Sequence, residues 1–225
     1  MTATLISLEL AFIDWGWIGG HLDDMWRATI EHIVLTSIAL IIGMILASLL
    51  SLVALRWRRT YGPITWVTGI LYTIPSLALF TFLVPIFGLS LTTAEVALVS
   101  YTLLILVRNV VAGIDGVPAD VIEASRGMGM TERQTFLSVR VPIALPVIIA
   151  GLRIAAVTTI GLVTVTVLIG QGGYGVFILR GIRRQFATEI LVGTLLSVIL
   201  AVLVDAALAG FERWATPWAR RSATP

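Results

Sequence analysis

Long apolar stretches alternate with short polar ones along this chain, and the alternation predicts several membrane-spanning helices. A spanning helix needs about 20 mostly apolar residues. The stretches that meet this criterion are residues 33–55, 64–87, 91–114, 144–169 and 190–211. The pattern therefore predicts an all-α integral membrane protein with about five transmembrane helices, whose two ends lie on opposite sides of the membrane.

The composition agrees with a membrane protein and narrows the chemistry. Hydrophobic residues make up 58% of the chain and charged residues 12%, with a mean hydropathy of +1.00, which lies outside the range of ordinary soluble domains. The absence of Cys excludes disulfides, thiolate metal sites and cysteine nucleophiles. The two histidines, His21 and His32, both precede the first long apolar run, so neither a metal site nor a histidine-based catalytic site is expected.

All 15 basic residues are Arg and none is Lys. The phosphate-binding loop of many nucleotide hydrolases needs a lysine that contacts the nucleotide phosphates. This chain therefore cannot contain such a loop. If its function uses ATP, another polypeptide must hydrolyse it.

The distribution of Arg predicts the orientation, because cytoplasmic loops carry the excess of basic residues. If the polar segment 115–142 is cytoplasmic, nine arginines lie inside, and the N-terminal region outside is acidic. The nine are Arg56, Arg58, Arg59, Arg126, Arg133, Arg140, Arg213, Arg220 and Arg221. We therefore expect the N-terminus outside and the C-terminus in the cytoplasm. Arg180, Arg183 and Arg184 oppose this assignment mildly, and we expect their segment to form a short helix at the outer surface.

Three regions follow from this pattern. Residues 1–30 contain Trp15, Trp17 and Trp26, which fits an interfacial segment with an aromatic belt, although a loosely ordered tail remains the alternative. Residues 31–212 form the predicted transmembrane domain. Residues 213–225 form a cytoplasmic tail.

The polar segment 115–142 is the most informative part of the sequence. Pro118 suits the first turn of a helix, and Asp120 and Glu123 place negative charge near its positive end. Gly127 and Gly129 should stop this helix. Thr131 to Gln134 then matches a capping box, so a second short helix should run until Pro142.

One side of the first predicted helix has the composition of a docking surface. Val121, Ala124, Ser125 and Met128 recur at helical spacing, with small residues in the middle and apolar residues at the ends. Such a surface permits close approach of a partner. Periodicity alone leaves open a second interpretation, an amphipathic loop that packs only on itself.

The residues of this segment resemble a known family. Glu123-Ala124-Ser125 with Gly129 and the following Ile143 to Pro146 is similar to the EAA loop of the permeases of ATP-binding-cassette (ABC) importers, with Ser125 in place of the second alanine. The runs EASRGMGMTERQTF, PIALPVIIAGLR and IGQGGYGVFILRGI resemble the osmoprotectant branch of that family. Gln171 and Tyr174 depart from this branch, which usually has Ala and Leu at these positions. These departures bear on the identity of the solute rather than on the class of transporter.

The resemblance implies a type I importer permease with a cytoplasmic coupling helix. Its partners would be ABC ATPase subunits, a second permease subunit of the same or a sister chain, an extracytoplasmic solute-binding protein and the bilayer, with no nucleic acid. ATP and Mg²⁺ would be bound by the ATPase, and this non-catalytic chain would bind no cofactor. The implied location is the bacterial cytoplasmic membrane. The residues that would couple to the ATPase are Val121, Glu123, Ala124, Ser125, Gly127, Met128 and Gly129.

Polar residues near Pro75 are the first candidates for a translocation pathway. Pro75 interrupts helical hydrogen bonding, and broken helices are tolerated at membrane depth only where protein or a water-filled cavity covers them. Tyr72, Thr73 and Ser76 cluster beside this break. We also include Thr166, although Thr158, Thr164 and Thr166 can each donate to a carbonyl one turn back and then need no ligand.

Other polar and small residues in the spans are assigned structural roles. Gly151, Ala155 and Thr159 form a stripe typical of tight helix packing. Arg153 or Arg108 could pair with Asp205, since charges in spans are usually paired or functional. The glycine-rich run GQGGYG, residues 170–175, follows no strand, which favours a flexible connection over a phosphate cradle.

The expected function is the transmembrane permease subunit of an ABC importer for a small osmoprotectant such as glycine betaine, choline or carnitine. The alternatives are a permease for amino acids or another small solute, and an ion-coupled secondary transporter. The last would be expected to show inverted repeats and a carboxylate at mid-membrane depth. An intramembrane enzyme lacks a nucleophile and base in a known pattern.

Overall fold

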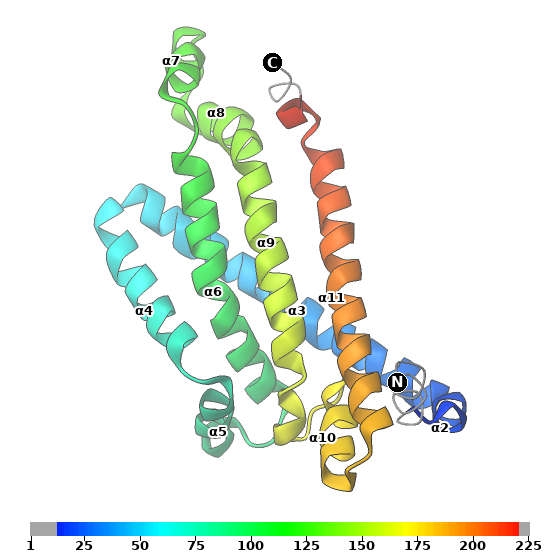
Figure 1. Cartoon of the computed structure of the whole chain (residues 1–225). Helices are drawn as coiled ribbons and strands as arrows, with labels where there is room; N and C mark the ends of the chain where they lie inside the picture. The colour runs from blue at the N-terminus through cyan, green and yellow to red at the C-terminus, as the bar shows by residue number, and fades with distance from the viewer. Residues whose placement is uncertain (1–12, 221–225) are drawn as a thin grey trace, which may run out of the picture. The chain divides into compact units, whose positions relative to one another are not determined.

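The computed structural model describes residues 13–220, and every regular element in this range is helical. The elements are α2 (Trp15–Gly20), α3 (Leu22–Arg56), η1 (Arg58–Thr60), α4 (Tyr61–Thr73), α5 (Ser76–Phe87), α6 (Leu91–Asp115), α7 (Ala119–Gly127), α8 (Glu132–Thr135), η2 (Phe136–Arg140), α9 (Val141–Val163), η3 (Thr166–Ile169), α10 (Gly175–Arg184), α11 (Ala187–Ala215) and η4 (Pro217–Arg220). Figure 1 shows their order along the chain from blue to red.

Four helices of the described chain are long and apolar enough to cross a membrane. They are Leu22–Arg56, Leu91–Asp115, Glu132–Val163 and Ala187–Ala215, and the pair α4 and α5 adds a fifth if it is counted as one broken span. The all-α fold with about five spans is thus confirmed. The break falls where it was predicted, because Ile74 and Pro75 are both extended, with ψ of 128° and 133°.

The ends of the predicted spans differ from the observed helices at two places. α3 begins at Leu22, so the segment 1–30 contains α2 and the first turns of α3, and residues 1–12 lie outside the described range. The fourth span ends as an α-helix at Val163, and a separate 3₁₀ turn, η3, follows. The apolar pattern could not separate them, because apolar residues continue on both sides of the junction.

The chain divides into two compact units. The first contains residues 13–38, Pro75–Leu98 and Thr159–Val202, and the second contains Ala39–Ile74, Val99–Thr158 and residues 203–220. In the second unit, parts of α3, α6 and α9 share a core of small and aliphatic side chains. Its buried members are Ala47, Ala54, Leu106, Val107, Val111 and Ala155.

Small residues allow the helices of the second unit to approach closely, as they do in other membrane proteins. α6 and α9, the green and yellow-green helices of Figure 1, meet at Gly113 and at Gly151. A Cβ on Gly151 would lie 2.4 Å from Cβ of Asn109, and one on Gly113 would lie 3.1 Å from the Ala144 carbonyl oxygen. The packing role predicted for Gly151 and Ala155 is confirmed.

The first unit is closed by a tight hairpin between α10 and the start of α11. A Cβ on Gly181 would lie 2.8 Å from the Ile190 nitrogen, and one on Gly193 would lie 2.8 Å from the Tyr174 carbonyl oxygen. Within this hairpin Arg180 pairs with the fully buried Glu189. α10 is the short helix predicted for the Arg180 to Arg184 segment.

Candidate functional site

The candidate site is the exposed side of α7, and the sequence around it fixes both helix ends. Pro118 is the N-cap residue, with ψ of 140°, and Asp120 lies in the first turn. The Asp120 carboxylate also accepts a 2.9 Å hydrogen bond from the Val121 N–H. A carboxylate at this position stabilises the start of the helix, because the first turn leaves N–H groups unpaired and carries partial positive charge.

The other end of α7 is closed by a glycine turn. Gly129 has φ of +80°, which L side chains rarely adopt. Its N–H donates to the Arg126 carbonyl at 2.9 Å, and the Met130 N–H donates to the Ser125 carbonyl at 3.1 Å. This pair of bonds is a Schellman motif, which satisfies the last carbonyls of the helix. The predicted stop of the helix at Gly127 and Gly129 is therefore confirmed.

Two side-chain contacts hold α7 against the short helix α8. The hydroxyls of Ser125 and Thr135 lie 3.1 Å apart, and Ser125 is only 1% exposed. Arg126 donates to the Glu132 carboxylate at 2.8 and 3.1 Å. The predicted capping box is present, because Thr131 and Gln134 exchange backbone and side-chain hydrogen bonds. The loop is thus built as a small rigid unit.

The exposed side of α7 consists of two kinds of residue. Glu123 offers a carboxylate, and Met128, 73% exposed, offers an unbranched apolar side chain that adapts to its contacts. Ala124 and Gly127 have little or no side chain, so another protein could approach the helix backbone closely there. Val121 is half-buried, and Ser125 faces α8 instead of solvent. Sequence periodicity grouped Ser125 with the exposed side and did not identify Thr135, its partner ten residues away.

The second short helix does not stop at Pro142, contrary to the prediction. α8 continues through a π-helical turn, η2, into α9, so that Glu132–Val163 is one long helix. A proline lacks the N–H that an α-helix needs and clashes with the preceding turn. A wider π turn directly before Pro142 relieves both problems, which explains why the helix passes through. α8 is therefore joined to a spanning helix without a flexible hinge.

A bidentate ion pair lies where α6 ends and the loop begins. Arg58 donates from Nη1 to Asp115 Oδ2 at 2.6 Å and from Nη2 to Oδ1 at 2.5 Å. Arg58 belongs to η1, which follows α3, so the pair joins two helix ends to the start of the loop. A cavity of about 310 Å³ beside it is lined by Arg56, Arg140 and Phe136, among others. The sequence offered no signal for this pair, because its members are 57 residues apart.

The residues predicted to line a pathway lie at the break between α4 and α5. Tyr72 is exposed and its ring lies 6.0 Å from that of Tyr101 in an edge-on arrangement. The Tyr101 hydroxyl donates to the carbonyl oxygen of Ile74, a group freed by the break. Tyr101 was not identified from the sequence, since its role depends on a neighbour 27 residues away.

Of the other residues at this break, Thr73 has a local hydrogen-bond partner. Thr73 donates to the Ile70 carbonyl at 2.8 Å, while Pro75 caps α5 and Ser76 is its first residue. The break coincides with the boundary between the two compact units, with Tyr72 and Thr73 in one and Pro75 and Ser76 in the other. Their contact with a solute stays a prediction.

The threonines of the α9 region follow the local pattern predicted for them. Thr158 donates to the Ile154 carbonyl, Thr164 to the Gly161 carbonyl and Thr166 to the Val163 carbonyl, at 2.7 to 2.8 Å. Thr166 is also fully buried. Its hydroxyl therefore already has the partner that the sequence suggested as the alternative to a ligand.

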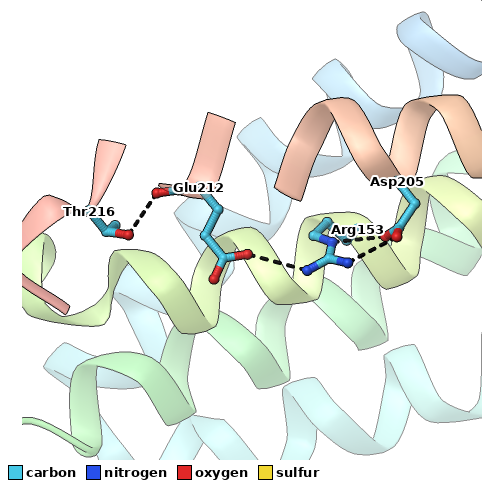
Figure 2. A network of polar contacts seen from close by, with 4 residues as sticks. All are labelled: Arg153, Asp205, Glu212 and Thr216. Atoms are coloured by element: carbon cyan, nitrogen blue, oxygen red, sulfur yellow. Dashed lines mark hydrogen bonds and ion pairs between the residues drawn. The ribbon is translucent and has the colours of Figure 1, made fainter. Parts of the chain in front are cut away.

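A network of charges joins α9 to the second half of α11, as Figure 2 shows. Arg153 donates from Nε and Nη2 to the two oxygens of Asp205, at 2.8 and 2.9 Å, and from Nη1 to Glu212 at 3.4 Å. Of the two arginines considered as partners of Asp205, Arg153 is thus the correct one. Glu212 was not identified, although it lies two helical turns after Asp205 on the same helix.

The glycine-rich run after α9 is anchored and not a flexible connection. The Gly173 N–H donates to Glu31 at 3.0 Å, and the Tyr174 N–H donates to Nδ1 of His32 at 3.3 Å. The opposite ring nitrogen of the buried His32 faces the Ile160 carbonyl at 3.0 Å. A Cβ on Gly172 would lie 1.8 Å from the Glu31 carboxylate, so this glycine is required by close approach. His32 and Glu31 escaped prediction because their partners are about 140 residues away.

Sequence comparison places these features among transport proteins. The family described as "Binding-protein-dependent transport system inner membrane component" matches residues 39–221. The chain is 38% identical over 194 residues to the choline transport system permease protein OpuBB of Bacillus subtilis, covering 86% of this chain and 89% of that protein. It is 36% identical over 204 residues to the carnitine transport permease protein OpuCB of Listeria monocytogenes, covering 91% and 93%.

Solved structures share the fold at lower identity. A chain of the inward-facing MetNI methionine ABC transporter superposes with a TM-score of 0.76 at 23% identity, covering 88% of this chain and 98% of that chain. An amino acid ABC transporter solved with histidines gives a TM-score of 0.75 at 18% identity, covering 89% and 98%. Together with the sequence match these findings decide against an ion-coupled secondary transporter. The chain belongs to the family of inner membrane components of binding-protein-dependent transport systems, the permease subunits of ABC importers.

Proposed function

We propose that this chain forms the translocation pathway of an ABC importer for a small osmoprotectant such as glycine betaine, choline or carnitine. The relatives named for choline and carnitine transport, at 38% and 36% identity over most of the chain, support the solute class. A third relative, named for glycine betaine, carnitine and choline, is 35% identical over 194 residues. A second permease subunit and an extracytoplasmic solute-binding protein complete the proposed assembly.

Energy enters through the exposed side of α7, which we propose as the surface that docks on an ATPase subunit. Glu123 and Met128 make the contacts, while Ala124 and Gly127 allow the partner backbone to approach. Val121, Ser125 and Gly129 position this surface, since Ser125 is buried against Thr135 and Gly129 forms the closing turn. The observation that carries the proposal is an exposed apolar and acidic helix side, held in place by the Ser125–Thr135 contact and the Gly129 turn.

The loop is suited to transmit a push into the membrane. α8 continues into α9 through η2, and Arg58 with Asp115 ties the start of the loop to the end of α6 and to η1. A displacement of α7 would therefore move two spanning helices directly. Closure of two ATPase subunits beneath a pair of permeases would then switch access to the pathway from one side to the other.

ATP and Mg²⁺ belong to the ATPase subunits in this proposal. The sequence contains no lysine, so the chain lacks the phosphate-contacting lysine of a nucleotide-binding loop. The proposed orientation in the cytoplasmic membrane puts α7 and the C-terminus in the cytoplasm and the N-terminus outside. The arginine excess on the α7 side supports it.

The test is uptake in vesicles that contain the permease, its ATPase and its binding protein. We expect ATP-dependent accumulation of at least one of radiolabelled glycine betaine, choline and carnitine. A Glu123→Arg variant should lose most uptake while the permease still folds, because the reversed charge disfavours docking. Arg133→Glu, an exposed charge reversal on α8, serves as the matched control. Uptake by the permease without ATPase, or full uptake by Glu123→Arg, would contradict the proposal.

A further inference from the structure

Arg153 lies well inside a spanning helix, where an uncompensated charge is costly. Arg153 is the thirteenth of the 23 residues of α9, which places it roughly 18 Å and 15 Å along the axis from the two helix ends at 1.5 Å per residue. The hydrocarbon core of a bilayer is about 30 Å thick. Arg153 therefore lies well inside α9, more than two helical turns from either end.

These charges are nevertheless only partly covered by the chain itself. The side chains of Arg153, Asp205 and Glu212 are 31%, 39% and 26% exposed. Charged residues within membrane-spanning segments almost always face other protein or a water-filled cavity, because lipid cannot solvate them. The uncovered side of this network must therefore face something polar in the assembled transporter.

A cavity opens beside the network. It measures about 450 Å³ and is lined by Ala150, Arg153, Ile154, Val157, Thr158 and Asp205. This size falls within the range of small-molecule sites, roughly 300 to 1,000 Å³. Figure 2 shows the Asp205 carboxylate and the Arg153 guanidinium directed toward each other across the two helices.

The chemistry of the lining selects one class of ligand. The network holds one cation and two carboxylates, so its side chains sum to a negative charge. The Thr158 hydroxyl is already donated to the Ile154 carbonyl. Arg153 is engaged by both acids through three of its N–H groups, and the carboxylate oxygens keep free acceptor capacity. Ala150, Ile154 and Val157 supply methyl groups. A quaternary ammonium cation, which has methyl groups and no N–H, matches this surface.

We infer that the Arg153–Asp205–Glu212 wall is a subsite of the translocation pathway that contacts the quaternary ammonium group of the passing solute through Asp205. The inference rests on the proposed function for its solute class. It assigns to the ion network a contact with the cargo in addition to the helix pairing that the sequence suggested. Arg153 acts as a positioning residue, because it holds the carboxylate of Asp205 with two hydrogen bonds.

The absence of cysteine allows a direct test by single-cysteine labelling. In vesicles with the full transporter, the Thr158→Cys variant is treated with a cationic reagent, trimethylammonium-ethyl methanethiosulfonate. A parallel sample is treated with a neutral methanethiosulfonate of similar size. We expect both reagents to react. Adding Asp205→Asn to this variant should lower the rate of labelling by the cationic reagent about fivefold relative to the neutral reagent. This factor corresponds to the loss of one charge interaction of ~1 kcal/mol at 4 Å in water.

The ratio of the cationic to the neutral labelling rate separates a loss of charge from a change in cavity shape. A distorted cavity changes both rates, whereas a lost carboxylate changes the cationic rate. Asp23→Asn, an exposed carboxylate of α3 outside the network, should leave the ratio unchanged. If Asp205→Asn fails to assemble, Glu212→Gln should lower the ratio about twofold for the same reason. No labelling of Thr158→Cys, or an unchanged ratio in the assembled acid variants, would overturn the inference.

Uptake by the wild-type transporter distinguishes this failure from failure of the proposed function. If the wild type accumulates none of the three solutes, the solute class is wrong whatever the labelling gives. If it accumulates one of them, that solute, delivered by its binding protein, should slow labelling of Thr158→Cys several-fold. Accumulation without protection would contradict the subsite alone.

Discussion

The α7 loop and the Arg153 network hold their charges in opposite ways. In the loop, Arg126 and Glu132 are six residues apart and are 56% and 74% exposed. In the network, Arg153 and Asp205 are 52 residues apart and lie within spanning helices. The loop therefore depends on backbone geometry and caps more than on its ion pair. The network depends on every one of its charges having a partner.

The largest effect is expected from breaking the network on one side. Arg153→Leu leaves Asp205 and Glu212 without their cation on a spanning helix, so the amount of assembled transporter should fall by about tenfold or more. The measurement is the yield of permease that co-purifies with its ATPase. Arg153→Leu with Asp205→Leu should recover part of that yield, because the uncompensated charge is removed. Normal yield from the single variant would show that the pair does not matter for assembly.

A smaller effect is expected at the turn that closes α7. Gly129→Ala places a side chain at φ of +80°, which costs roughly 1–2 kcal/mol. Local opening should rise about fivefold to thirtyfold, and trypsin should cleave at Arg126 and Arg133 faster by a similar factor. The matched control is Gly127→Ala, because Gly127 is helical and a Cβ there meets no atom within 4 Å. Equal cleavage of both variants would mean that the Schellman turn does not hold the loop.

The smallest effect is expected from the exposed ion pair of the loop. Arg126→Gln removes the contact with Glu132, and pairs this exposed contribute about 0–1 kcal/mol. Cleavage by trypsin at Arg133 should rise by less than about fivefold at low salt. High salt should reduce the difference from wild type, since ions screen surface pairs. A change as large as that of Gly129→Ala would contradict the comparison between caps and charges.

The sequence predicted the loop well because its determinants are local. Pro118, the glycines and the capping box act on neighbours within a few residues, and each was found where the pattern indicated. The π turn before Pro142 was not predicted. A proline usually ends a helix, and only the continuing apolar packing of α9 makes a wider turn the better solution.

Contacts between distant segments were predicted poorly. Asp205 was given two possible partners, and nothing in the pattern could choose Arg153 over Arg108. The anchoring of Gly173 and Tyr174 by Glu31 and His32 needs the first spanning helix to pass beside the run after α9, which composition does not reveal. The same holds for Tyr101 at the break after α4.

The most direct test of the central claim is disulfide cross-linking between the permease and its ATPase subunit. The chain has no native cysteine, so Ala124→Cys and Met128→Cys each report a single position on α7. Paired with cysteines along the surface groove of the ATPase, both should cross-link, and Leu137→Cys on η2 should not. Cross-linking confined to Leu137→Cys, or absent from α7 in a transporter that still accumulates solute, would contradict docking at this surface.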